Sequence, residues 1–177
     1  MRSRADTARI RALLEALGNT ARRDLRAYLT GGASAVLCGW RESTIDVDVL
    51  FVPDEDRLLR ALPHLKESLR INIELACPAD FIPELPGWEK RSRFIEQFGK
   101  LGCYHYDFYA QALAKIERGH SQDLSDVGEM LRRGLIEPKE LLRCFAQIEP
   151  KLYRYPAVDP ASFRRAVESA IAPPAGT

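Results

Sequence analysis

Apolar residues repeat at the spacing of an α-helix in several parts of the chain. From Ile10 to Leu17 they recur every three or four positions and predict a helix over 7–17, which Gly18 is placed to end. The stretch 55–69 repeats the pattern despite Pro63. Later stretches with the same spacing predict further helices over 107–118, 123–133, 138–146 and 161–170.

Strict alternation of apolar and polar residues marks the strands. Residues 44–51 and 71–75 alternate in this way and are rich in β-branched side chains. A further pair of strands is expected over 91–106, with a turn at Gly99 and Lys100. The small apolar run 33–38 suits a short buried helix. The sequence therefore predicts an α/β first half and a helical second half.

Composition narrows the class of protein. The 177 residues are 46% hydrophobic and 29% charged, as in an ordinary globular domain with or without a helical appendage. No apolar signal core and no membrane-length apolar stretch is visible, so we expect a cytoplasmic protein with no membrane partner. The net charge of +1 favours neither the presence nor the absence of a nucleic-acid partner.

Two carboxylates share one face of the strand predicted over 44–51. Asp46 and Asp48 are two residues apart, so their side chains point to the side opposite the apolar set, about 7 Å from each other. Such a pair repels itself unless it is solvated or neutralised by a cation. A solvated strand edge and a site for a divalent metal both fit this pattern.

Two neighbouring features favour the metal site. Glu74 has the same parity on the strand predicted over 71–75, so it joins the two aspartates if the strands pair. Gly31 and Gly32 precede the short helix, where a phosphate can approach the backbone, and Ser34 adds a hydroxyl. Metal-binding acids next to a phosphate cradle are suited to phosphoryl or nucleotidyl transfer.

The run GGASAVLCGWRESTIDVDVLF, residues 31–51, resembles the signature of the DNA polymerase β-like nucleotidyltransferases. Its Arg, Ser/Thr and Asp-x-Asp order is most similar to the compact AbiEii/MenT-type, toxin-like members. The run AQALAKIERGHSQDLSDV resembles their second motif, so the resemblance covers roughly residues 25–135. It implies the nucleotidyltransferase fold, a mixed sheet flanked by helices, followed by a C-terminal helical segment.

The resemblance also implies roles for residues of the first motif. Asp46 and Asp48 would hold Mg²⁺ or Mn²⁺. Gly31, Gly32 and Ser34 would cradle the triphosphate of an NTP substrate.

Residues of the second motif receive roles in the same way. Lys115 would neutralise phosphate charge, and helical spacing places it off the buried stripe. Asp123 or Asp126 would position or deprotonate an acceptor hydroxyl. Arg41, from the first motif, fits either a nucleotide contact or a structural bridge.

The third metal-binding acid stays open at this point. Glu74 fits by parity, and Asp80 and Asp107 are its rivals, although Asp107 is also placed to cap the helix that follows it. The chain is also much shorter than the large toxins of this group, and we expect it to have little C-terminal domain with which to bind RNA.

The expected domains are a nucleotidyltransferase α/β core over 1–110, a helical segment packed on it over 111–170, and a flexible tail over 171–177. The expected activity is Mg-dependent transfer of an NMP from an NTP to RNA, tRNA or a protein hydroxyl. The resemblance further implies a place in a toxin–antitoxin or phage-defence pair with a cognate partner. Two alternatives remain: an inactive module of the same fold that acts as an antitoxin or assembly partner, and a nucleotidyltransferase acting on a small molecule.

Overall fold

The computed structural model describes residues 4–173 and divides the chain into two compact units. Unit 1 comprises Met1–Cys77 and Ser92–Tyr106, and unit 2 comprises Pro78–Arg91 and Asp107–Thr177. The tail expected over 171–177 lies largely outside the described residues. Within the described part of the chain, no helix combines the length and the apolarity needed to cross a bilayer.

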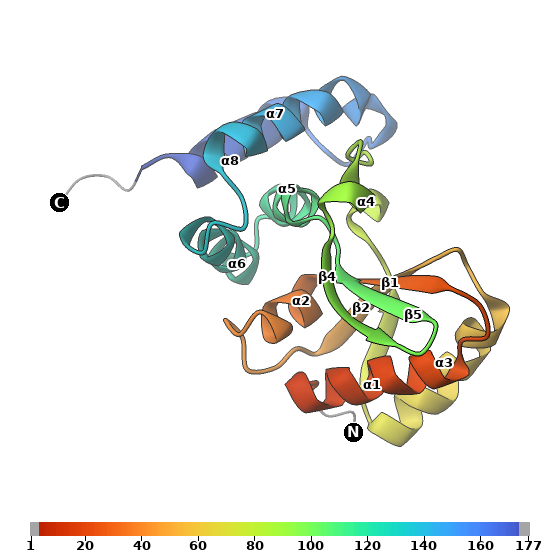
Figure 1. Cartoon of the computed structure of the whole chain (residues 1–177). Coiled ribbons are helices and arrows are strands. Elements are labelled where there is room, and N and C mark those ends of the chain that lie inside the picture. The colour runs from red at the N-terminus through yellow and green to blue at the C-terminus, as the bar shows by residue number, and fades with distance from the viewer. Residues whose placement is uncertain (1–3, 174–177) are drawn as a thin grey trace. The chain divides into compact units, whose positions relative to one another are not determined.

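Unit 1 is built on a five-stranded mixed sheet in the order β3-β2-β1-β5-β4 (Figure 1). β1 pairs antiparallel with β2 and parallel with β5, β2 pairs parallel with β3, and β4 pairs antiparallel with β5. The predicted mixed sheet is confirmed. The strands are β1 (Leu25–Thr30), β2 (Asp46–Val52), β3 (Asn72–Leu75), β4 (Arg93–Phe98) and β5 (Leu101–His105).

Three helices supply the rest of the core of unit 1: α1 (Thr7–Thr20), α2 (Gly31–Leu37) and α3 (Asp56–Leu69). Their apolar residues form one cluster with the strand residues of a single parity, such as Ala27, Val49 and Cys103. One face of the sheet is thus covered by helices. The opposite face carries the residues of the other parity, among them Arg26, Asp48 and Tyr104.

The prediction that Gly18 ends the first helix is wrong, because α1 continues to Thr20. A Cβ on Gly18 would lie 2.4 Å from the Cβ of Phe98 at the end of β4. Gly18 is therefore required for close packing between α1 and β4 and does not mark a helix end.

The alternation of residues predicts burial for two apolar side chains that are in fact exposed at the strand ends. Ile45 precedes β2 and is 64% exposed, and Leu75, the last residue of β3, is 56% exposed. The alternation is maintained in the rest of the two stretches, where the other apolar residues of that parity are buried.

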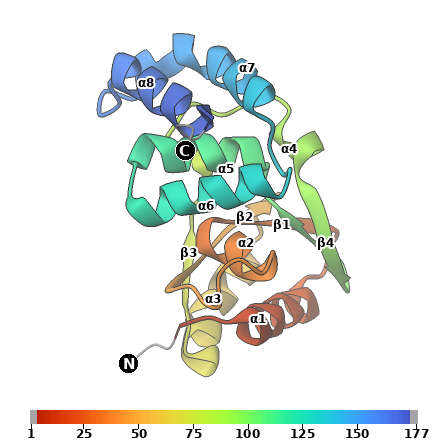
Figure 2. The same ribbon diagram turned by 90° about the vertical axis from the view of Figure 1, so that its left-hand side faces the viewer.

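Unit 2 is helical and contains two separate chain segments. In Figure 2, α5 and α6 lie side by side, and α5 also contacts α7 and α8. The expected boundary at residue 110 lies within α5. The elements are η1 (Pro78–Asp80), α4 (Trp88–Arg91), α5 (Phe108–Arg118), α6 (Ser121–Arg132), α7 (Pro138–Ile148), η2 (Glu149–Arg154) and α8 (Pro160–Ile171).

Candidate active site

The three acids predicted from strand parity lie on the sheet face that is not covered by α1 and α3. Asp46 and Asp48 are half-buried on β2, and the valines between and after them are fully buried on the other face. The register pairs Asp46 with Asn72 and Asp48 with Glu74 on the neighbouring strand β3. Residues paired in register point to the same side, so the three carboxylates share one face.

Asn72 connects two of these acids. Its Nδ2 donates to Asp46 Oδ1 over 2.7 Å and to Glu74 Oε1 over 3.0 Å. The amide thus fixes the position of one aspartate relative to the glutamate. Asn72 is not among the residues predicted for the site, although its position two residues before Glu74 gives it the same parity.

Gly31 lies against the second aspartate. It adopts φ = +59°, and a Cβ added to it would lie 2.7 Å from Asp48 Oδ2. A side chain at this position would therefore strain the backbone and also displace the Asp48 carboxylate.

Gly32 permits a second close approach. A Cβ there would lie 2.0 Å from Thr44 Oγ1 and 3.4 Å from Arg41 Nη1. Thr44 Oγ1 donates to the Asp46 carbonyl oxygen over 3.0 Å, so its side chain is fixed on the segment that leads into β2. The structure thus places Gly31 beside Asp48, and Gly32 beside Thr44 and Arg41.

Ser34 lies deeper than expected for a phosphate-binding hydroxyl. It is fully buried, and its Oγ donates to the Leu29 carbonyl oxygen over 3.0 Å and lies 3.1 Å from His105 Nδ1. The predicted binding of the triphosphate by the Ser34 hydroxyl is supported by no contact in the structure, so it stays a prediction.

His105 is held in the interior by this serine and by a thiol. Because Ser34 Oγ donates to the backbone, it can accept from His105 Nδ1, which leaves Nε2 facing Cys38 Sγ at 3.6 Å. Burial, with the nearby charge of Arg93, lowers the pKa of His105 to about 4. The imidazole is therefore neutral at pH 7 and connects α2 with β5.

The second motif forms a buried ion cluster inside unit 2. Lys115 Nζ lies 2.7 Å from Asp126 Oδ2 and 3.2 Å from Asp123 Oδ1, and Arg118 donates twice to Asp123. Burial by itself raises the pKa of Asp123, but the Arg118 hydrogen bond and the Lys115 charge outweigh it and leave the pKa below its usual value.

The expected position of Lys115 was wrong. Its exposed fraction is 4%, so it lies on the buried side of α5 and not off it. Helical spacing identifies buried positions that are apolar, but it cannot identify a buried cation whose partners come from another helix. The triphosphate role of Lys115 and the acceptor role of Asp123 and Asp126 stay predictions.

The two rivals of Glu74 both lie in unit 2. Asp107 is 1% exposed, caps α5 through the Tyr109 backbone N–H, and accepts two hydrogen bonds from Arg91 at 2.7 and 3.0 Å. Burial raises its pKa more than Arg91 lowers it. The expected capping role of Asp107 is confirmed, and both of its oxygens are engaged. Asp80 is an exposed residue of η1.

The acidic face can hold part of a metal coordination shell. Among residues 4–173, no three His, Cys, Asp or Glu side chains converge closely enough to form a complete ligand set. Mg²⁺ is commonly bound by one or two carboxylates, with substrate phosphates and water as its other ligands. The half-buried pair and the bare α-carbon of Gly31 beside Asp48 fit that mode of binding.

No curated protein and no solved structure matches the chain. The model of one family, described as a nucleotidyltransferase of unknown function (DUF6036), matches residues 8–153. This range includes the glycine pair, the three acids of the sheet face and the ion cluster of unit 2. The chain therefore belongs to this family of nucleotidyltransferases.

Proposed function

We propose that the protein transfers a nucleoside monophosphate from an NTP to a hydroxyl group, with a divalent metal ion held by Asp46 and Asp48. The observation that carries this proposal is the arrangement of three carboxylates in register on one sheet face, next to a glycine that leaves Asp48 accessible. Membership of the nucleotidyltransferase family supports it independently.

The reaction is a substitution at the α-phosphorus of the NTP. The acceptor oxygen forms a new P–O bond, the bond between the α-phosphorus and the bridging oxygen breaks, and pyrophosphate leaves. Bound Mg²⁺ would stabilise charge on the phosphate oxygens. Glu74, the exposed acid of the three, would accept the hydroxyl proton, and Arg41 would contact the nucleotide beside Gly32.

The test uses each α-labelled NTP with Mg²⁺ and total cellular RNA, followed by measurement of label on RNA and on protein. Wild type should transfer label from at least one NTP, and Asp48→Asn should lower the rate at least about 100-fold, the loss typical of one electrostatic group at a reacting phosphate. Asp56→Asn, at an exposed aspartate on α3, is the matched control and should retain full activity.

The chemical nature of the acceptor distinguishes the narrower proposals. Label on RNA would support an RNA or tRNA acceptor, and label on protein would support a protein hydroxyl. On the resemblance to toxin-like nucleotidyltransferases we further propose a toxin or phage-defence role with a cognate partner. Growth arrest that depends on Asp48 when the protein is expressed would support that role, and normal growth would count against it.

A binding module without catalysis is the second candidate. It is favoured by two observations: the described residues hold no complete metal-ligand set, and Lys115 is already neutralised by two carboxylates. If Mg²⁺ and NTP bind but no label is transferred to RNA, protein or small molecules, this candidate replaces the enzyme.

A further inference from the structure

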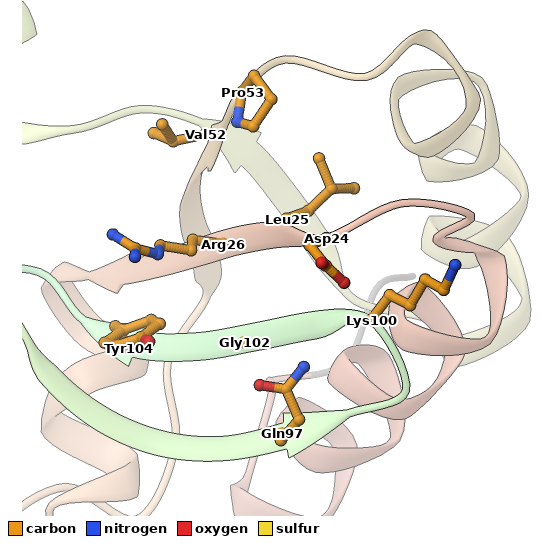
Figure 3. A pocket seen from close by; sticks show the side chains of 9 residues that line it. All are labelled: Asp24, Leu25, Arg26, Val52, Pro53, Gln97, Lys100, Gly102 and Tyr104. Atoms are coloured by element: carbon orange, nitrogen blue, oxygen red, sulfur yellow. The ribbon is translucent and has the colours of Figure 1, made fainter.

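A polar hollow lies on the sheet face of unit 1 that carries Asp46 and Asp48, away from these two acids. Its volume is about 540 Å³, within the range of sites for small molecules. Figure 3 shows Gly102 as bare ribbon in the middle, with Arg26 and Tyr104 at one end, Lys100 at the other and Gln97 along one side.

Gly102 of β5 lies in the middle of the hollow. The register places it between Arg26 of β1 and Gln97 of β4. A Cβ on Gly102 would lie 3.1 Å from both Gln97 Oε1 and Tyr104 Cε2, so only a glycine lets these two side chains close over the backbone. Side chains of three adjacent strands therefore line the hollow.

One end of the hollow is flat and cationic. The Arg26 guanidinium lies 5.8 Å from the centre of the Tyr104 ring. Phe94 packs edge-to-face on Tyr104 with ring centres 5.4 Å apart, and Tyr28 lies 5.4 Å from it on the other side. The tyrosine is thus fixed in place, and a planar guanidinium and an aromatic ring form a stacking surface.

The other end is polar and positively charged. Lys100 Nζ donates to the Arg22 carbonyl oxygen over 3.0 Å, which holds the ammonium at the start of β5. Lys100 and Tyr104 are four residues apart in sequence, about 13 Å along the strand. Asp24 is the single acid of the lining, so two cations leave a net positive charge.

The hollow is separate from the acidic site. Arg26 precedes Thr30, the register partner of Asp48, by four residues of β1, again about 13 Å. Tyr28 lies between them on the same face and is fully buried. A ligand in the hollow therefore does not depend on a metal ion at Asp46 and Asp48.

We propose that this hollow binds a single strand of nucleic acid, with one base stacked on Arg26 and Tyr104, the phosphate of a neighbouring nucleotide beside Lys100, and the Gln97 amide at the base edge. The two ends are about 13 Å apart, farther than a base lies from its own phosphate, so they match successive nucleotides of one strand. Stacking and phosphate contacts of this kind accept any base. This inference does not rest on the transferase activity.

The experiment measures binding without metal, in EDTA, in an Asp46→Asn/Asp48→Asn background that removes the acidic site. The probe is a fluorescein-labelled single-stranded RNA oligonucleotide, followed by fluorescence anisotropy. Arg26→Gln and Tyr104→Leu should each weaken binding about tenfold, the usual effect of losing a stacking partner. Lys100→Gln should weaken it several-fold and lower the salt slope by about one.

Matched controls are Arg143→Gln and Lys139→Gln, at exposed positions of α7. Equal affinity of the Arg26 and Lys100 variants and wild type would overturn the proposal, and so would equal losses in the controls. Unlabelled AMP that competes as well as an oligonucleotide would overturn the assignment to a strand, and competition by the oligonucleotide alone would support it. An acidic peptide that competes equally well would overturn the assignment to a nucleotide.

Discussion

The two aspartates of β2 are the residues on which the proposed chemistry depends most directly. They share a face of one strand, so their negative charges repel when no cation is bound. We expect Asp46→Asn/Asp48→Asn to be at least as stable as wild type in EDTA. Mg²⁺ with NTP should raise the Tm of wild type and leave that of the variant unchanged, because only a ligand that binds the folded state stabilises it. Thermal unfolding with and without Mg²⁺ measures both effects, and an equal rise in Tm for the two proteins would contradict the metal role.

Gly31 allows a sharper test because Gly39 provides a control. Both glycines have positive φ, +59° and +85°, but only a Cβ on Gly31 meets Asp48, and the Cβ of Gly39 meets nothing within 4 Å. Alanine at either position should cost about 1–2 kcal/mol of stability through left-handed backbone strain. Gly31→Ala alone should also abolish metal-dependent NTP binding, measured by calorimetry. If the two variants bind alike, Gly31 has no role beyond the turn.

At the scale of the element, α5 and α6 are joined by a buried cation. Lys115→Met would retain most of the side-chain volume but leave Asp123 and Asp126 without their shared ammonium. Removing one partner of a buried ion pair typically costs about 3–5 kcal/mol. We expect a loss of that size in urea unfolding, and less than about 0.5 kcal/mol for Lys139→Met on the exposed side of α7.

The same variant separates the two roles of Lys115. A lysine that only contacts triphosphate would leave stability unchanged on substitution and weaken NTP binding by about 1.5–3 kcal/mol. A stable Lys115→Met with reduced nucleotide affinity would therefore favour the role implied by the family resemblance. A large loss of stability would favour the structural role that its buried contacts indicate.

His105 connects α2 to β5 and should make stability depend on pH. Its pKa is about 4 in the folded protein and about 6.5 when unfolded, so the unfolded chain takes up a proton first as the pH falls. The stabilisation is complete above pH 6.5 and is lost towards pH 4, by up to about 3 kcal/mol. Urea unfolding at several pH values should show a shallower slope for His105→Gln than for wild type. Parallel slopes would mean that another group causes the loss.

The sequence predicted those parts of the fold and site that follow from local periodicity. Strand parity alone placed Asp46, Asp48 and Glu74 on one side, because alternation is a property of each strand by itself. It could not predict that Ser34 turns its hydroxyl to the Leu29 carbonyl, or that Lys115 is buried. Both facts depend on partners in another element, Leu29 of β1 and the two aspartates of α6, and the periodicity of a single element does not encode them.

At the scale of the whole molecule, neither of the two units is a single continuous segment of the chain. Pro78–Arg91 shares unit 2 with Asp107–Thr177. Arg91 pairs with Asp107, and the Tyr155 hydroxyl donates to the Ala79 carbonyl oxygen over 3.0 Å. These contacts join segments that are separated by two strands of unit 1, so a boundary drawn at one position in the sequence could not describe them.

The two tryptophans provide a test of whether the units unfold separately, because Trp40 belongs to unit 1 and Trp88 to unit 2. The hydrophobic core cluster from Ala5 to Cys103 consists of residues of unit 1 alone. In a Trp40→Phe background only Trp88 reports unfolding, and we expect Lys115→Met to lower the urea concentration at the midpoint of that transition. In a Trp88→Phe background only Trp40 reports unfolding. The midpoint of that transition should stay the same, because the lost ion pair lies wholly in unit 2. Each tryptophan variant without the Lys115 substitution serves as its own reference. Coincident transitions that shift together would show a single cooperative unfolding step and would contradict separate cores.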